Sequence, residues 1–197
     1  MSRTFMRRAL WPGVLFLAIP AAAADLELRF SALERIIAEQ MFTQEGKRYV
    51  KGSAQAKCQY AYLETPKLGE EETRLRVQAR FSGRSALDLF GRCMGMGDSF
   101  DLTLTATPVP KDGAIALQDV KVTTVKDSYY IRQVRKSLEQ SFKKDFKIEV
   151  KDHARRLLEQ PSASSIYKQE LSDFVLQGIR VTRDALVLAV EFRLIVK

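Results

Sequence analysis

The clearest alternation of apolar and polar side chains lies between Phe100 and Val125. Its first half alternates strictly between apolar residues and Asp or Thr, which is typical of a strand with one buried and one solvent-exposed face. A loop at Pro108–Gly113 ends in an Asp-Gly pair, a strong turn signal. On the return strand the apolar phase slips by one residue near Gln118 and Asp119, which predicts a β-bulge. The stretch therefore predicts a long, bent hairpin whose apolar face wraps another element.

The segment before Gly46 predicts a short strand followed by a helix. Residues 26–30 alternate between apolar and charged side chains, whereas the apolar residues of 33–41 recur at helical spacing. Ser31 and Glu34 have the spacing of a capping box, which places the start of the helix there. Gly46 is expected to end the helical pattern.

Further strands are predicted between this helix and the long hairpin. Residues 47–63 indicate a strand or a strand pair, which Thr65-Pro66 and Gly69 are expected to break. Residues 74–81 alternate cleanly, and residues 85–90 extend the same sheet. The outer face of 74–81 is nearly all arginine, which fits either a solvated face or a basic docking strip.

A long helical region follows the hairpin. Asp127 or Ser128 is expected to cap it, and apolar residues recur every fourth position over 130–158. Each such step drifts about 40° around a helix of 3.6 residues per turn, so a straight helix would not keep one apolar face. The helix must either curve around the sheet or break, and we favour a break near 144–150 with Asp152 capping a second segment.

The C-terminal region predicts a further hairpin. Residues 167–175 are expected to contain a helical turn, and Gly178 leads into the hairpin. In the last strand, Leu186 to Val196, every second residue is apolar and several residues of the opposite side are apolar too. A strand that is apolar on both sides belongs inside a sheet.

Residues 1–24 have the features of an export signal. Arginines precede the apolar run 9–19, and Ala22-Ala23-Ala24 offers a cleavage site. We therefore expect a periplasmic or secreted protein in which residues 25–197 form a single domain, since that length is enough for one core. No later stretch approaches the apolar length of a membrane span.

The net charge of +8 comes from scattered basic residues. They do not cluster with aromatic residues, which argues against nucleic-acid binding, and weak contact with an anionic membrane surface is compatible with them.

The chain has two cysteines, Cys58 and Cys93, and one histidine, His153. In an exported protein the cysteines most simply form one disulfide, and two buried free thiols are the alternative. His153 lies among charged residues on a helical segment, so a Ser-His-Asp or Cys-His arrangement has little to build on. No catalytic residue, metal site or cofactor is therefore predicted, although a pair of acidic residues acting as acid and base stays open.

The order of these elements and the closing stretch 176–188 resemble a known family. The pattern Leu, Gly, x, Val, turn, Leu, x, Leu runs through this stretch, beginning at Leu176 and Gly178. The chain resembles the small bacterial members of the tubular lipid-binding (TULIP-like) superfamily. The resemblance implies an α+β fold in which a strongly twisted, bent antiparallel sheet wraps a long amphipathic helix, with a short N-terminal helix and an apolar groove.

We expect a periplasmic binding or carrier protein for lipid or another apolar ligand, held between the long helix and the concave sheet. The predicted apolar faces exceed what the interrupted helix can cover, which leaves surface for a ligand. The residues expected to line this groove are Leu102, Leu104, Ile115, Leu117, Val120, Val134, Leu138, Phe142, Leu188, Val190 and Phe192. The alternatives are a non-enzymatic structural or assembly partner in the envelope with a fully packed core, and an uncharacterised hydrolase.

Overall fold

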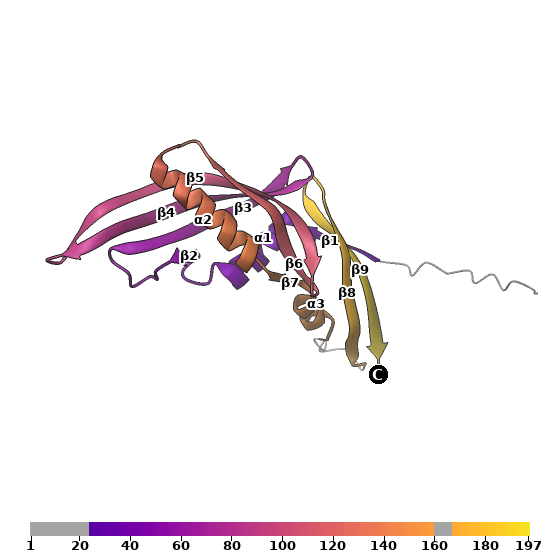
Figure 1. Cartoon of the computed structure of the whole chain (residues 1–197). Helices are drawn as coiled ribbons and strands as arrows, with labels where there is room; N and C mark the ends of the chain where they lie inside the picture. The colour runs from indigo at the N-terminus through magenta and orange to yellow at the C-terminus, as the bar shows by residue number, and fades with distance from the viewer. Residues whose placement is uncertain (1–23, 160–166) are drawn as a thin grey trace, which may run out of the picture.

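The computed structural model describes residues 24–159 and 167–197 as an α+β fold of two antiparallel sheets and three helices (Figure 1). The elements are β1 (Ala24–Arg29), α1 (Phe30–Met41), β2 (Lys47–Lys51), β3 (Gln59–Glu71), β4 (Arg74–Leu89), β5 (Arg92–Lys111), β6 (Ala114–Thr124), α2 (Tyr129–Asp145), β7 (Ile148–Glu149), α3 (Val150–Glu159), β8 (Gln169–Val181) and β9 (Ala185–Val196). The predicted export signal lies outside the described residues, except for Ala24, which begins β1.

The larger sheet has six strands in the order β2-β3-β4-β5-β6-β7, so each strand pairs with its neighbours in the sequence. It curls into a half-barrel, and β4 and β5 extend well beyond the other strands (Figure 1). The smaller sheet has the order β1-β9-β8. The long terminal strand β9 therefore lies inside a sheet, as its apolar pattern predicts.

The predicted hairpin is formed by the second half of β5 together with β6. Its turn consists of Asp112 and Gly113 alone, whose φ angles of 53° and 76° are those of a tight hairpin turn. The expected six-residue loop is therefore wrong, because residues 108–111 continue β5. The predicted bulge is confirmed, since the pairing shifts between Thr105 and Thr107 and Asp119 opposite them has a φ of 49°.

We expected strand β3 to break at Thr65-Pro66 and at Gly69, but it does not. It continues to Glu71, and the pairing with β4 shifts between Glu64 and Lys67. Thr65 has a φ of 50°, so a bulge takes up the residue pair in which proline cannot donate a hydrogen bond. The bulge therefore keeps in one strand a segment that the sequence divides.

Helix α1 packs its predicted apolar face into the core, but its start and end differ from the prediction. The helix begins at Phe30 and ends at Met41, and no side chain caps it. Ser31 lies inside the helix, so the predicted capping box is wrong. Glu34 instead accepts a hydrogen bond of 2.8 Å from the Leu68 backbone N–H, which ties α1 to β3.

The predicted break in the long helical region is confirmed. The Ser128 hydroxyl accepts a hydrogen bond from the Ile131 N–H at the start of α2, which ends at Asp145, and the two-residue strand β7 separates it from α3. Asp152 does not cap α3, because that helix begins at Val150 and Asp152 lies in its first turn. Helix α2 packs one face on the larger sheet, and a sheet wrapped around this helix is not shown.

The predicted helical turn at 167–175 is wrong, because residues 169–181 form β8. Leu171 and Phe174 are both buried and lie three residues apart, a spacing that imitates a helix. The pairing of β8 with β9 shifts between Leu171 and Asp173, and this bulge brings both side chains to the same face of a strand.

One continuous hydrophobic core joins both sheets and all three helices. Its largest side chains with almost no exposed surface are Phe81, Leu33, Leu63, Leu75, Leu104, Ile115, Leu138, Ile148, Leu186 and Leu188. The concave side of the larger sheet is thus covered by packed side chains rather than left open.

Candidate binding site

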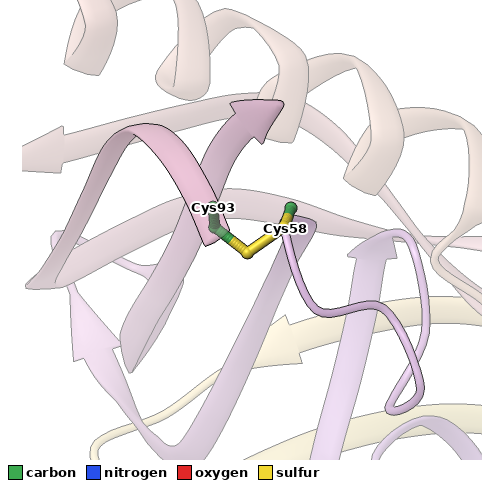
Figure 2. Close-up of a disulfide and its surroundings, with 2 residues drawn as sticks. All are labelled: Cys58 and Cys93. Atoms are coloured by element: carbon green, nitrogen blue, oxygen red, sulfur yellow. A yellow bond between two sulfur atoms is a disulfide. The ribbon is translucent and has the colours of Figure 1, made fainter. Parts of the chain in front are cut away.

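Cys58 and Cys93 form the predicted disulfide (Figure 2). Their Cα atoms lie 5.2 Å apart, and the bond joins the segment before β3 to the start of β5. The backbone N–H of Ala86 also donates to the Cys58 carbonyl at 2.9 Å. The far part of the β4–β5 hairpin is therefore fixed to the rest of the sheet at two points.

Most residues expected to line a ligand groove lie in the packed core instead. Buried are Leu102, Leu104, Ile115, Leu117, Leu138, Phe142, Leu188 and Val190. Val120 and Val134 are half-buried, and Phe192 is 45% exposed near the end of β9. The structure therefore does not bring these eleven residues around one open space.

The cavity found among the core residues is small. It has a volume of about 20 Å³ and lies between α1, α2 and the sheet, with Leu102, Leu104 and Phe142 in its wall. Pockets that hold small molecules measure roughly 300–1,000 Å³. This part of the interior therefore has no room for a lipid chain.

A larger opening of about 220 Å³ lies between α2 and strands β2–β4, and we call it the α2 groove. The helix contributes Tyr130, Gln133, Val134, Ser137 and Leu138 to its wall, and the strands and their neighbours contribute Val50, Lys51, Tyr60, Ala61, Phe81, Arg84 and Ser85. Only Val134 and Leu138 belong to the predicted set. The other lining residues come from four distant stretches of sequence, so no local pattern identifies them.

Beside the α2 groove, the Tyr130 side chain of α2 lies close to Gly83 of β4. A Cβ atom added at Gly83 would lie 2.7 Å from the Phe81 ring and 3.2 Å from the Tyr130 hydroxyl. A larger residue at this position would therefore displace one of the two rings. Burial raises the pKa of Tyr130, and the negative charge of Asp98 acts in the same direction, so this hydroxyl stays neutral beside the sheet.

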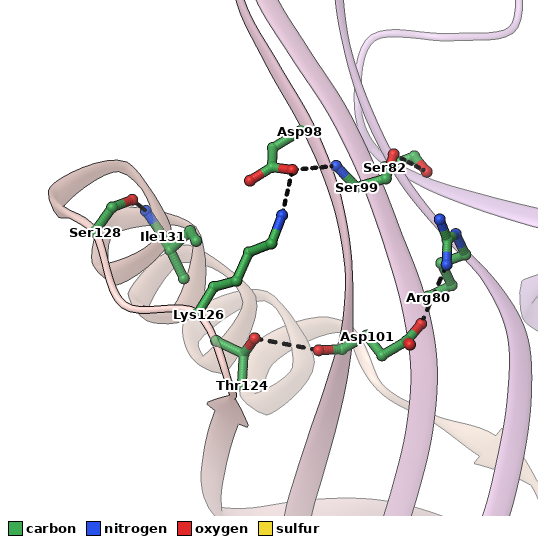
Figure 3. A network of polar contacts seen from close by, with 9 residues as sticks. All are labelled: Arg80, Ser82, Asp98, Ser99, Asp101, Thr124, Lys126, Ser128 and Ile131. Atoms are coloured by element: carbon green, nitrogen blue, oxygen red, sulfur yellow. Dashed lines mark hydrogen bonds and ion pairs between the residues drawn. The ribbon is translucent and has the colours of Figure 1, made fainter.

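A polar network holds the start of α2 against β5 (Figure 3). The Lys126 ammonium donates a hydrogen bond of 2.8 Å to the Asp98 carboxylate, which also accepts one from the Ser99 N–H. The hydrogen bond from Lys126 is the main reason that the pKa of Asp98 is lowered. The Thr124 hydroxyl donates to the Asp101 carbonyl at 3.2 Å. These contacts fix the segment that connects β6 to α2, and with it the width of the α2 groove.

At the other end of α2, a partly buried cation covers an aromatic ring. The Arg48 guanidinium lies 5.1 Å from the centre of the Phe142 ring, a cation–π arrangement. Burial lowers the pKa of Arg48, and the charge of Asp145 opposes this effect. Arg48 thus closes the C-terminal end of α2 against β2.

One cation faces the α2 groove. Lys51 belongs to its wall, is exposed and pairs with Ala61, which pairs with Gly83 on the side of the sheet that faces α2. Arg84 also belongs to the wall, but its side chain leaves the opposite face of β4, because side chains alternate along a strand. Lys51 forms no ion pair with a described residue, so an anionic group that reached the groove would find a partner there.

The part of the chain that the structure describes also contains metal-binding residue types and a histidine. No three His, Cys, Asp or Glu side chains of residues 24–159 and 167–197 lie close enough to hold a metal ion. His153 lies on α3, where its Nδ1 atom is 3.2 Å from the Arg156 guanidinium, and it does not line the α2 groove. None of the described helices is long and apolar enough to cross a membrane.

Comparison with known proteins gives no match: no protein-family model, curated protein or solved structure is similar to this chain. The resemblance to TULIP-like proteins stays an expectation from the sequence. The case for a function therefore depends on the α2 groove and the surfaces around it.

Proposed function

We propose that the protein is an exported, non-enzymatic binding protein for anionic amphiphiles with one long alkyl chain. The observation that carries the proposal is the α2 groove, which combines an apolar wall with Lys51, a cation that forms no ion pair with a described residue. The disulfide Cys58–Cys93 supports the exported location, because disulfides persist in oxidising compartments.

The groove favours an alkyl chain over a compact ligand. Its wall includes Val134, Leu138, Phe81 and Ala61. Its volume of about 220 Å³ is below that of ordinary small-molecule pockets, so it takes the end of a chain rather than a whole lipid. Burying about six methylene groups would contribute about 5 kcal/mol. This is close to the lowest cost of association, about 4 kcal/mol, so a contact with the headgroup must add to the affinity.

The ammonium group of Lys51 favours a carboxylate or phosphate headgroup, because it is a compact positive charge with three hydrogen-bond donors at the wall of the groove. An uncharged amphiphile of the same chain length would gain only the apolar contacts. Headgroup charge therefore distinguishes this proposal from nonspecific binding of detergent.

Titration of dodecanoate by calorimetry tests the proposal. In the variant Ser137→Leu a larger apolar side chain fills the groove from an exposed helix position, and we expect dodecanoate to bind at least tenfold more weakly. Gln140→Leu is the matched control, because it lies on the same helix, is exposed and does not line the groove. Equal binding by both variants, or none by the unmodified protein, would contradict the proposal.

A second titration tests the headgroup. We expect Lys51→Gln to reduce dodecanoate affinity to that of uncharged dodecyl maltoside. The exposed Lys121→Gln, which does not line the groove, should leave the affinity unchanged. A preference for dodecanoate that survives Lys51→Gln would assign the headgroup to another place.

The filled core supports a second candidate, an envelope assembly partner that acts through its surface. The cavity of about 20 Å³ shows that the interior packing is nearly complete at the place where a ligand was first expected. If no amphiphile binds in the titrations above, this candidate is favoured.

A further inference from the structure

The β4–β5 hairpin continues beyond the rest of the larger sheet as a two-stranded projection. Strand β3 pairs with β4 only as far as Ser85, and β6 pairs with β5 only from Leu102 onward. We call residues 86–97 the arm; residues 86–95 lie beyond the end of β3, and Met96 and Gly97 pair with Ser85 and Arg84 at its base. In Figure 1 the arm forms the far left end of the molecule, past the start of α2.

The arm exposes large apolar side chains. They are Leu87 at 64%, Leu89 at 44%, Phe90 at 103%, Met94 at 63% and Met96 at 67% of their full exposure. Such a concentration of exposed apolar residues on one projecting hairpin marks an interaction surface.

Strand register places most of these side chains on one face. Leu87 pairs with Met94, and farther along the same hairpin Phe81 pairs with Phe100 in the core. Because side chains alternate along a strand, Leu87 and Phe81 point to the same side of β4. The apolar face of the arm is therefore the core face of the sheet, extended beyond the elements that cover it.

The arm is held in its projecting position. The disulfide holds Cys93, two residues past the turn at Phe90-Gly91, to Cys58 just before β3, and the hydrogen bond from the Ala86 N–H to the Cys58 carbonyl holds the base of the arm. At Gly95 the two strands approach so closely that an added Cβ would lie 2.5 Å from the Ala86 Cα. The exposed face is thus presented by a braced hairpin rather than by a loose loop.

Charge indicates what covers the arm. Lys57, Arg84 and Arg92 are exposed at or beside it, against Asp88, and none of the four forms an ion pair with a described residue. Asp98, which follows the arm, is already paired with Lys126. A second copy would bring the same cations face to face, which opposes association through two arms. An anionic bilayer instead accepts apolar side chains below its headgroups and attracts cations at its surface.

We propose that the arm docks the protein on anionic lipid membranes, with Phe90 and its apolar neighbours entering the interface and the cations contacting lipid headgroups. Phe90 occupies the turn at the tip, where its fully exposed ring would enter first. The arm and the α2 groove share one side of β4, so docking would bring the groove close to the lipid. The docking itself does not depend on binding in the groove.

A tryptophan reporter tests the docking directly. The chain has one tryptophan, Trp11, which lies in the predicted export signal, so in a protein of residues 25–197 the variant Phe90→Trp reports the tip alone. We mix it with vesicles of phosphatidylcholine and phosphatidylglycerol whose acyl chains carry bromine, and we expect a blue shift and strong quenching. Val175→Trp in the same background is the control, because Val175 is an exposed apolar residue on β8.

Absence of quenching at Phe90→Trp, or equal quenching at both positions, would overturn the proposal. A blue shift without vesicles that grows with protein concentration would also overturn it, because a second copy would then cover the arm.

Two further variants separate docking from the groove. Leu87→Ser with Met94→Ser, checked for folding by circular dichroism, should weaken vesicle binding of the reporter at least tenfold. Ser137→Leu should leave quenching of the reporter unchanged. Loss of quenching in Ser137→Leu would show that membrane contact by the tip depends on the α2 groove, and the proposal of an independent docking surface would then be wrong.

Discussion

Leu104→Ala and Leu138→Ala should destabilise the protein by different amounts, although the same atoms are removed. Both side chains are nearly fully buried, at 1% and 2% exposure. Leu104 borders the enclosed cavity of about 20 Å³, whereas Leu138 borders the α2 groove of about 220 Å³, which opens to solvent. The comparison therefore tests whether the core is closed and the groove is open.

Both variants lose the same buried apolar surface, but they differ in whether the space left behind is enclosed. Removing the equivalent of three methylene groups costs about 2.4 kcal/mol at about 0.8 kcal/mol each. Leu104→Ala enlarges an enclosed cavity, and roughly 80–100 Å³ of empty space adds about 2 kcal/mol. In Leu138→Ala the new space joins an opening that water already reaches. We therefore expect losses of about 4 to 5 kcal/mol for Leu104→Ala and about 2.5 to 3 kcal/mol for Leu138→Ala.

Urea unfolding followed by circular dichroism measures both values. The slope of the unfolding free energy against urea should stay the same in the two variants, so that the shift in midpoint reports stability alone. Equal losses, or a larger loss for Leu138→Ala, would refute the assignment of an enclosed core and an open groove. Losses below about 0.5 kcal/mol, the size expected of surface substitutions, would refute the packing of α2 on the sheet.

Three further predictions concern the contacts that hold the groove and the arm. Replacing Cys58 and Cys93 together by alanine should cost about 4 kcal/mol in urea unfolding, because the bond closes a loop with a sequence separation of 35 residues; a loss below about 1 kcal/mol would contradict this. The lowered pKa of Asp98 contributes stability above the ordinary pKa of aspartate, and this is lost as the pH falls through the lowered value. Lys126→Met should remove that part of the acid dependence, and an unchanged profile of melting temperature against pH would count against it. Gly83→Ala should lower the free energy of unfolding by about 1 to 3 kcal/mol, because the added methyl group crowds the Phe81 ring. Unchanged stability in urea would contradict the close packing at Gly83.

The parts of the fold that the sequence predicts are those with an unbroken local period. The hairpin within 100–125 alternates strictly, and even its bulge near Asp119 is visible as a change of phase. The break between α2 and α3 follows from the drift of a four-residue repeat around a helix. Each of these signals lies within a few turns or residue pairs, so no knowledge of distant contacts is needed.

Bulges explain the errors in secondary structure. The bulge after Leu171 brings Leu171 and Phe174, three residues apart, to one face of a strand, so their helix-like spacing does not indicate a helix. The bulge at Thr65-Pro66, where Thr65 has a positive φ, keeps β3 continuous although the proline in the sequence predicts an end. In both places the pairing partner decides the conformation, and the partner lies elsewhere in the chain.

The candidate site could be predicted only in small part, because it depends on what covers each apolar face. Val134 and Leu138 were placed on the packing face of α2, whereas Tyr60, Ala61 and Arg84 meet them only in the folded protein. The pattern of residues 85–90 correctly indicates that β4 continues. The pattern does not show that the apolar side chains of this part of β4 stay exposed, because periodicity indicates which side chains share a face but not whether another element packs on that face.

The most direct test of the proposed function is to locate bound dodecanoate by nuclear magnetic resonance. Isotope-filtered measurements detect nuclear Overhauser contacts between the alkyl chain of the ligand and methyl groups of the protein. We predict contacts with Val50, Val134 and Leu138 in the α2 groove. Contacts with core methyl groups such as those of Leu104 and Leu117, or contacts spread over the surface without saturation, would contradict the account.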